Sequence, residues 1–207
     1  MYDPQFHPDR PQFAWLVEHL DGWQFGEQGL LLAIAEHLDL KGRAIEYGAG
    51  DGETLPLTAE RYVNSRRGGS LLIEIDEKSR SKLAKRYPAA EIHASLDWSR
   101  VPKESVAIAV IDIDSHDSVV MREMLGAGVR PAVMMVEHLD REYPVTTSHA
   151  DPLPRWALGL AMQGGFRLQD TAETLQYLAH RNGYERIGLN RCNSFFIRGD
   201  LYPQMFK

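Results

Sequence analysis

Ionisable side chains crowd the end of the most apolar run in this sequence, VAIAVIDI, which lies within residues 105–113. Burying several charges beside an apolar strand is costly unless the groups are paired or used. The crowding therefore predicts that this strand end has a chemical function. Its ionisable members fall within six residues and are Asp112, Asp114, His116 and Asp117.

A second apolar run, residues 130–136, also ends in ionisable groups, Glu137 and His138. Parallel strands that neighbour each other end at the same edge of a sheet, so we expect the ionisable residues after the first run to lie close to those after the second. An imidazole titrates near neutral pH, and His116 or His138 could therefore deprotonate a substrate hydroxyl as a general base.

Carboxylates at the same two strand ends allow a second interpretation. Asp112 or Asp114 with Glu137 could hold a hard divalent cation such as Mg²⁺, which prefers oxygen ligands and acidifies a bound hydroxyl. Without a metal, Asp112 or Asp114 would orient the substrate for the base. A third interpretation is purely structural, because aspartates cap helices and histidines satisfy local hydrogen bonds.

A glycine-rich stretch follows the predicted strand at 43–47 and has the sequence EYGAGDG. Glycines let the backbone turn sharply and approach a ligand, and such loops lie where open α/β sheets bind ligands. A dinucleotide site needs a small residue where Glu53 stands, and a P-loop needs a Gly-Lys-Ser/Thr sequence that does not follow here. The acidic loop would repel a diphosphate but suits the sulfonium and ammonium groups of S-adenosylmethionine (SAM). The predicted cofactor contacts in this stretch are Glu46, Gly48, Ala49 and Gly50.

An acidic pair follows the next apolar run, LLIEID at residues 71–76. Glu74 lies about one strand–helix–strand unit after the glycines, where an acid can accept both hydroxyls of a ribose. Ile75 stands beside it and belongs to the same predicted contact region. Strand alternation points Glu74 and Asp76 the same way, so the sequence does not fully separate them, and we prefer Glu74.

These residues require elements that bring their strand ends together. Continuous apolar runs separated by helical patterns predict a parallel sheet covered on both faces, followed by an antiparallel hairpin. The expected fold is an α/β Rossmann-like sandwich with a mostly parallel seven-stranded sheet, a C-terminal antiparallel hairpin and two N-terminal helices. Helices are predicted at 11–20, 27–38, 54–62, 77–86, 118–125, 155–163 and 174–182, and strands at 43–47, 70–75, 91–94, 105–113, 130–136, 184–189 and 193–201.

Two segments outside the parallel strands carry further expectations. The helix at 11–20 is expected to bury one face that includes Leu16 and Val17. Residues 140–154 contain three prolines and His149, and they are predicted to form a loop long enough to cover a site.

Composition limits the classes of protein that fit. The chain has 207 residues, of which 43% are hydrophobic and 25% charged, as expected of one globular domain. A formal net charge of -6 argues against nucleic acid or an anionic membrane as partner. The single Cys192 excludes an intrachain disulfide and a thiol-rich metal site, and no apolar run approaches a membrane span. We expect a cytoplasmic protein with a small-molecule substrate, and leave a homo-oligomer open.

Taken in order, the motifs resemble those of the FkbM-like SAM-dependent methyltransferases over most of residues 25–201. The resemblance implies class I methyltransferase topology, SAM as cofactor and methyl transfer to oxygen, often on sugars or secondary metabolites. In this fold the turn after the third parallel strand borders the adenine, which adds Ser95 and Leu96 to the predicted cofactor contacts, together with Asp112. The matching blocks are FGEQG at 25–29, IEYGAGDG at 45–52, LLIEID at 71–76, IDIDSHD at 111–117, GYERIG at 183–188 and NSFFIR at 193–198.

Two departures from the family pattern fall at the catalytic edge. Ser115, His116 and Ser118 stand where relatives often carry Gly and Asn or an aromatic residue, and Glu137-His138 replaces the more usual Glu-Tyr.

We expect an N-terminal helical cap at 1–42 and a SAM-binding domain at 43–207, within one structural domain. The leading hypothesis is O-methylation of a small hydroxylated metabolite or sugar. The alternatives are a catalytically silent binding or assembly protein and a metal-dependent enzyme of the same fold.

Overall fold

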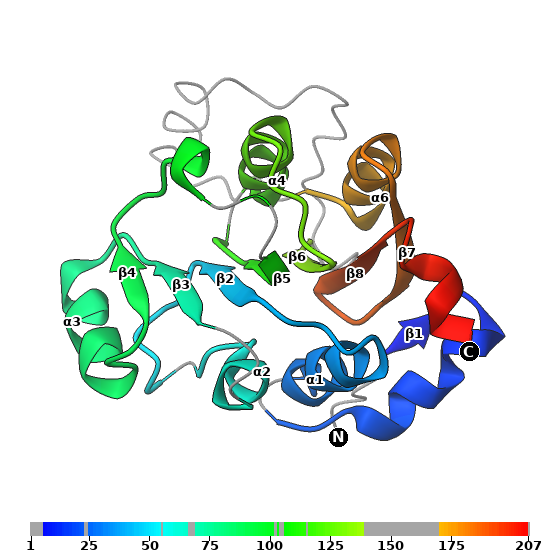
Figure 1. The fold of residues 1–207 in the computed structure, drawn as a ribbon, viewed down its shortest axis with the longest axis horizontal. Coiled ribbons are helices and arrows are strands. Elements are labelled where there is room, and N and C mark those ends of the chain that lie inside the picture. Colours follow the sequence, from blue (N-terminus) through cyan, green and yellow to red (C-terminus); the bar gives the residue numbers. More distant parts are fainter. Residues whose placement is uncertain are drawn as a thin grey trace.

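A single sheet organises the part of the chain that the computed structural model describes, which is residues 6–22, 25–54, 56–65, 69–101, 103, 106–114, 116–138 and 170–206. The strand order is β1-β7-β8-β6-β5-β2-β3-β4 (Figure 1). The strands are β1 (His7–Pro8), β2 (Arg43–Tyr47), β3 (Ser70–Ile73), β4 (Glu91–His93), β5 (Val106–Ile111), β6 (Val133–Glu137), β7 (Tyr184–Leu189) and β8 (Asn193–Arg198). The helices are η1 (Pro11–His19), α1 (Glu27–His37), α2 (Glu60–Asn64), α3 (Glu77–Arg86), η2 (Trp98–Arg100), α4 (Asp117–Gly126), α6 (Ala172–Arg181) and η3 (Tyr202–Phe206).

The central strands are parallel, as the sequence predicts. β2 pairs with β3 and β5, β3 pairs with β4, and β5 pairs with β6, all in parallel. Every side chain of β3 and β5 is buried, because helices cover both faces of the sheet. β7 and β8 form the expected antiparallel hairpin, and β8 joins it to β6. This is the Rossmann-like methyltransferase fold.

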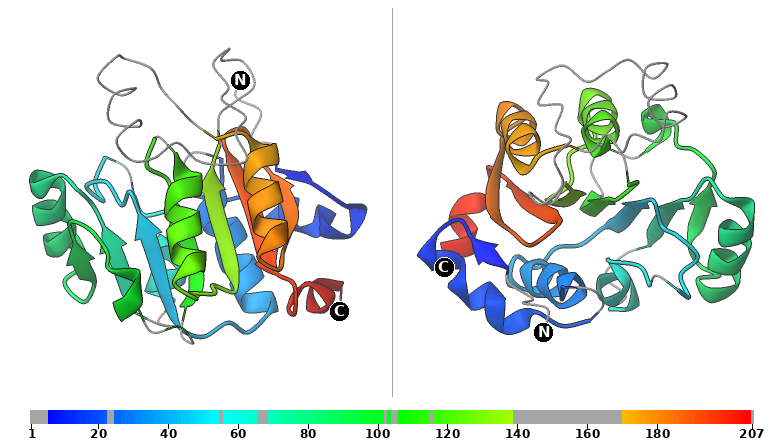
Figure 2. Two further views of the ribbon diagram at one scale, coloured as in Figure 1. Left: turned by 90° about the horizontal axis from the view of Figure 1, so that it is seen from above. Right: turned by 180° about the vertical axis from the view of Figure 1, so that it is seen from behind.

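Different helices cover the two faces of the sheet (Figures 1 and 2). α4 and α6 lie on one face, whereas α1 and α2 lie on the other. Side chains of β6 alternate between the two cores: Val133 and Met135 pack on the α1 side, and Met134 and Val136 on the α4 side. The same alternation determines toward which face each residue just beyond a strand end points.

The prediction of seven strands is wrong by one, because the N-terminal segment supplies an eighth. His7 and Pro8 pair antiparallel with Gly188 and Leu189 of β7 and extend the sheet at that edge. A Cβ on Gly188 would lie 2.7 Å from the backbone oxygen of His7, so glycine lets this two-residue strand approach. A strand of two residues has too few positions to show a periodic pattern.

The first N-terminal helix differs from the expected one in its winding. Residues 11–19 form a 3-10 helix, in which side chains three apart share a face. Phe13 and Leu16 are therefore fully buried, whereas Val17, expected on the same face, is 43% exposed. A pattern with 3.6-residue periodicity does not carry over to a helix with three residues per turn.

The helix expected at 54–62 is also displaced, since only Glu60–Asn64 is helical. Carboxylates occupy the backbone donors before it. Asp51 accepts hydrogen bonds from the amides of Glu53 and Thr54, and Glu46 accepts from those of Thr58 and Ala59. In a helix begun at Thr54 the amides of Thr58 and Ala59 would donate to helical carbonyls, so their bonds to Glu46 compete with that helix.

Several predicted features fall on residues outside the described part of the chain. They are the loop at 140–154 with His149, the helix at 155–163, and Ser115. Among the described helices, none has both the length and the apolarity that a membrane crossing requires.

Candidate functional site

The glycine loop folds directly against the ends of the neighbouring strands. The amides of Gly48 and Ala49 both donate to the carbonyl of Ile73, at 2.9 and 3.1 Å, where β3 ends. Gly48 has a φ of 89°, and a Cβ there would lie 2.7 Å from the carbonyl carbon of Asp112 and closer still to its oxygen. Only glycine permits this approach, so the loop joins the ends of β2, β3 and β5.

The carboxylate of Glu74 is bound to the same loop. Its Oε2 accepts a 2.9 Å hydrogen bond from the amide of Gly50, and its Oε1 accepts a 2.8 Å bond from the amide of Asp76. Asp76 instead accepts from the amide of Ser79 and caps α3. The structure thus separates the two acids that the sequence left together, and it places Glu74 at the loop.

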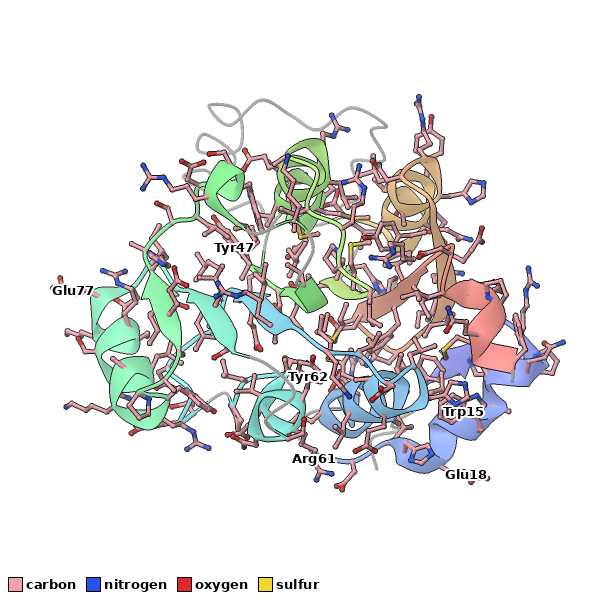
Figure 3. The ribbon with its side chains drawn as sticks, viewed as in Figure 1. Trp15, Glu18, Tyr47, Arg61, Tyr62 and Glu77 are labelled. Carbon is pink, nitrogen blue, oxygen red and sulfur yellow. The ribbon has the colours of Figure 1, made fainter. Side chains whose placement is uncertain are left out.

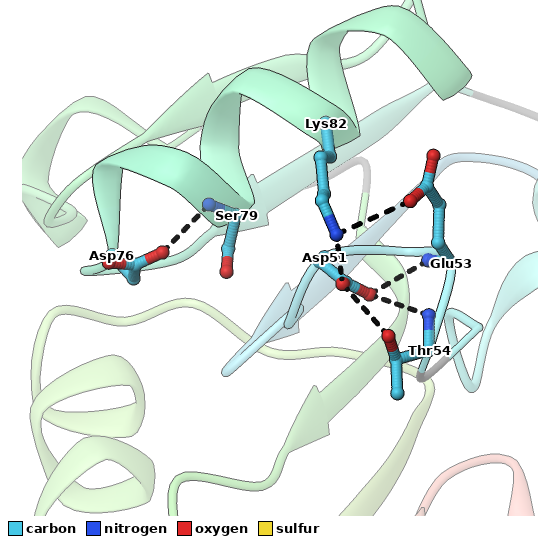
Figure 4. A network of polar contacts seen from close by, with 6 residues as sticks. All are labelled: Asp51, Glu53, Thr54, Asp76, Ser79 and Lys82. Carbon is cyan, nitrogen blue, oxygen red and sulfur yellow. Dashed lines mark hydrogen bonds and ion pairs between the residues drawn. The ribbon is translucent and has the colours of Figure 1, made fainter.

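A lysine on α3 offsets part of the acidity of the loop (Figure 4). Lys82 Nζ lies 2.9 Å from Asp51 Oδ2 and 3.3 Å from Glu53 Oε2. The hydrogen bond from Lys82 holds the pKa of the Asp51 carboxyl well below its ordinary value. The loop therefore repels a diphosphate less than the sequence suggests, because Lys82 pairs with two of its acids.

Glu46 is buried beneath the loop and does not face outward. It is 4% exposed, and its two oxygens accept hydrogen bonds from the amides of Thr58 and Ala59 at 2.8 and 3.1 Å. Burial raises the pKa of the Glu46 carboxyl to about 7. Both oxygens are engaged, so within the described structure Glu46 holds the chain after the loop in place.

Apolar and aromatic residues lie on the β3 side of the loop. Ile75 is 86% exposed, which is unusual for a large aliphatic side chain, and Leu96 is half-buried against the core on the α4 side. Ser95 is exposed, and Asp97 caps η2 by accepting from the amide of Ser99. Tyr47 projects above β2 in Figure 3 and stacks on Trp98 at 6.0 Å between ring centroids.

Asp112 and Glu137 meet at the ends of β5 and β6, as expected. Their carboxyl groups lie within hydrogen-bonding reach of each other. Burial, together with the charge of Asp114, raises the pKa of the Asp112 carboxyl above its ordinary value. Asp114 itself is exposed and has a φ of 53°.

The first residue of α1 supplies a third acid that the sequence did not reveal. Glu27 is 2% exposed, and its Oε1 accepts hydrogen bonds from Asn190 Nδ2 at 2.7 Å and Asn193 Nδ2 at 3.1 Å. Burial raises the pKa of the Glu27 carboxyl, and its charge in turn raises that of Asp112. The only sequence signal was its place in the FGEQG block, because contact with residues more than 160 positions away depends on the fold.

The two candidate histidines have different polar neighbours in the described structure. His138 follows Val136 on the α4 side of the sheet, and its Nδ1 lies 3.1 Å from Ser194 Oγ of β8. His116 precedes α4 and is 5% exposed, with Nδ1 at 3.7 Å from Asp170 Oδ1. Strand alternation and the turn into α4 therefore assign the two imidazoles to different neighbours.

Around His116 several buried polar atoms have no hydrogen-bond partner among the described residues. Both ring nitrogens of His116 belong to this group, and so does Oδ2 of the fully buried Asp117. Asp170, which the sequence did not single out, is fixed by a 2.8 Å hydrogen bond from the amide of Ser118 to its Oδ2. An imidazole with both nitrogens unpaired beside a carboxylate can accept or donate a proton.

The metal alternative is not supported. Within the described ranges, no group of three or more His, Cys, Asp or Glu side chains has an arrangement that could hold a metal ion. Asp112 and Glu137 hydrogen bond to each other, and the exposed Asp114 does not complete a site with them. Asp112, Asp114 and Glu137 are therefore better described as a carboxyl pair with a charged neighbour than as Mg²⁺ ligands.

Solved methyltransferase structures share this fold. One is CalS10 bound to SAM, an amino pentose methyltransferase from Micromonospora echinaspora involved in calicheamicin biosynthesis. The similarity covers 86% of this chain and 92% of CalS10, with a TM-score of 0.55 and 13% sequence identity. DesVI from Streptomyces venezuelae is similar over 83% of this chain and 90% of its own, with a TM-score of 0.51 and 14% identity. At these identities the similarity establishes the fold alone. No protein-family profile and no curated protein sequence matches the chain significantly.

Proposed function

We propose that the chain is a SAM-dependent methyltransferase that methylates an oxygen of a small hydroxylated metabolite or sugar. The observation that carries the proposal is the glycine loop, which is bound to the Glu74 carboxylate and packed against the Asp112 carbonyl at three adjoining strand ends. The FkbM-like resemblance, a cytoplasmic location, and a helical cap at 1–42 on a SAM-binding domain at 43–207 belong to the same proposal.

The residues around the loop fit SAM, which supplies an electrophilic methyl group when bound. A carboxylate offers about four lone-pair sites, so Glu74 can accept ribose hydroxyls while keeping its bonds to Gly50 and Asp76. The exposed Ile75 provides an apolar surface for a purine. Ser95 and Leu96 lie in the turn that follows the neighbouring strand β4. Burying such an exposed aliphatic side chain against a ligand is favourable.

His116 is our preferred general base, and His138 is the alternative. A base must accept the proton of the attacking hydroxyl, and His116 has both ring nitrogens without partners among the described residues. The carboxylate of Asp170, 3.7 Å from Nδ1, would stabilise the imidazolium that forms. His138 already has Ser194 Oγ at its Nδ1, which makes it less suited to the role. Asp112 and Asp114 would orient the substrate.

Calorimetric titration with SAM and with S-adenosylhomocysteine tests the cofactor. We expect micromolar binding of both, and binding should be unchanged by a chelator because the metal alternative has no support. Failure of the wild type to bind either molecule would refute the proposal. Replacing Glu74 by Gln should weaken binding at least tenfold, whereas Glu18→Gln, on the exposed surface of η1, should leave it unaltered.

Methyl transfer from labelled SAM to a library of sugars, phenols and small alcohols tests the reaction. His116→Ala should lower turnover at least a hundredfold while SAM affinity is retained, as expected for loss of a general base. His180→Ala, an exposed histidine on α6, is the matched control. Full activity of His116→Ala with loss in His138→Ala would transfer the role to His138. Intact SAM binding without any product would leave the silent binding protein as the better interpretation.

A further inference from the structure

Four buried or half-buried acids gather beyond the ends of β5 and β6, and we call Glu27, Asp112, Asp117 and Glu137 the acid cluster. Asp112 shares a hydrogen bond with Glu137, and the charges of Glu137 and Asp112 both act on the fully buried Asp117. The charge of Glu27 acts on Asp112. Among the described residues, no lysine or arginine forms an ion pair with Glu27, Asp112 or Asp117.

Two buried acceptors of this region lack hydrogen-bond partners among the described residues. Asn193 is 1% exposed and donates from Nδ2 to Glu27, which fixes the orientation of its amide. Its Oδ1 has no hydrogen-bond partner in the described part of the chain, and neither has Oδ2 of Asp117. Leaving a buried acceptor without a hydrogen-bond donor is unfavourable. A ligand that carries several donors and a positive charge could donate to such acceptors and would offset the acidity.

The strand order separates the acid cluster from the proposed adenosine contacts. Glu74 and Ile75 follow β3, and the glycine loop follows β2. The cluster extends in the opposite direction, from Asp112 after β5 to Glu137 at the end of β6 and Asn193 at the start of β8. The two regions meet where Gly48 packs against Asp112. The cluster therefore lies on the side of the sheet edge that is left for the methyl acceptor.

We propose that the acid cluster binds the protonated amino group of the methyl acceptor, so that the substrate is an amino-bearing hydroxylated small molecule. An ammonium supplies three donors and no acceptor, which matches a site with carboxylates and unpaired carbonyl-type oxygens. The inference rests on the proposed function and adds the chemical class of its substrate. The methyl group still goes to a hydroxyl oxygen, and the amino group serves for recognition.

Matched probe pairs test this substrate class. Tyramine and 4-(2-hydroxyethyl)phenol, glucosamine and glucose, and ethanolamine and ethylene glycol each differ by an amino group in place of a hydroxyl. Binding is measured by ligand-observed NMR with S-adenosylhomocysteine present to fill the cofactor site. We expect the amino member of at least one pair to bind at least tenfold more tightly than its partner. Glu137→Gln should reduce this preference to less than threefold, and Glu18→Gln should preserve it.

Each outcome decides the inference. Equal binding within all pairs, including binding of none of the probes, overturns it while SAM binding by the wild type keeps the proposed function intact. Asp112→Asn provides a second variant if Glu137→Gln fails to fold, as judged by circular dichroism. The ammonium of SAM is the competing source of the same chemistry. If Glu137→Gln weakens SAM but not 5′-methylthioadenosine, which lacks the amino-acid portion, the cluster serves the cofactor and the acceptor assignment is wrong.

Discussion

Replacing Gly48 by alanine should cost much more stability than the same change at Gly183. Both glycines have positive φ values, 89° and 80°, so alanine at either position must adopt a left-handed conformation at a cost of about 1–2 kcal/mol. A Cβ on Gly183 would meet nothing within 4 Å. A Cβ on Gly48 would press into the carbonyl of Asp112, 2.7 Å from its carbon, and the resulting backbone shift adds about 1–3 kcal/mol.

Urea unfolding of the two variants measures this difference. The sum for Gly48→Ala is about 2–5 kcal/mol, against about 1–2 kcal/mol for Gly183→Ala. For a chain of this length each kcal/mol lowers the Tm by about 2–4 °C, so Gly48→Ala should melt about 4–20 °C below the wild type. SAM binding should be lost in Gly48→Ala alone. Equal destabilisation of the two variants would refute the reasoning, because the close approach to Asp112 is what distinguishes them.

Three further predictions concern single residues. Burial raises the pKa of Glu46 from 4.5 to about 7, so the native state binds the proton of this carboxyl more tightly than the unfolded state does. The associated contribution to the free energy of unfolding is full below pH 4.5 and is lost as the pH rises through 7, an effect of about 3 kcal/mol. Glu46→Gln should flatten urea-unfolding stability between pH 4.5 and 7, at an overall cost of about 1–3 kcal/mol because one oxygen acceptor is lost, and an unchanged slope would contradict the assignment. Ile75→Ala should change the free energy of unfolding by less than about 0.5 kcal/mol, since the side chain is 86% exposed, yet weaken SAM binding about tenfold by calorimetry; equal affinity would remove Ile75 from the site. Lys82→Met should raise the pKa of Asp51 toward its ordinary value in an NMR titration, because the hydrogen bond from Lys82 is the main cause of the low pKa. A pKa that stays low would assign the effect to the amides of Glu53 and Thr54.

Local patterns predicted the parallel strands well. β5 is so continuously apolar that both of its faces had to be buried, and the helix pattern at 77–86 matches α3 residue for residue. Patterns failed where other groups competed for the backbone or where the element was very short. The helix start near Thr54 moved because Glu46 binds the amides of Thr58 and Ala59, which a helix begun there would use. β1, with two residues, could not be detected at all.

Some contacts of the candidate site were likewise predicted from the sequence, and others were not. The glycine loop and Glu74 were identified from residue types and spacing, and the structure brings them into direct contact. The meeting of Asp112 and Glu137 followed from the expectation of neighbouring parallel strands. The roles of Asp117 and Asp170 could not be predicted, since whether an acid is buried or solvated depends on what packs over it.

The sequence by itself determined which strands are buried, where the chain turns and which loop can approach a ligand, because periodicity and glycine conformation act over a few residues. Only the tertiary structure decided which charges are paired. Lys82 offsets the loop acids from another helix, and Glu27 joins Asn193 from the opposite end of the chain. Desolvation and the partner of a charge depend on distances between segments far apart in sequence, and the fold alone sets those distances.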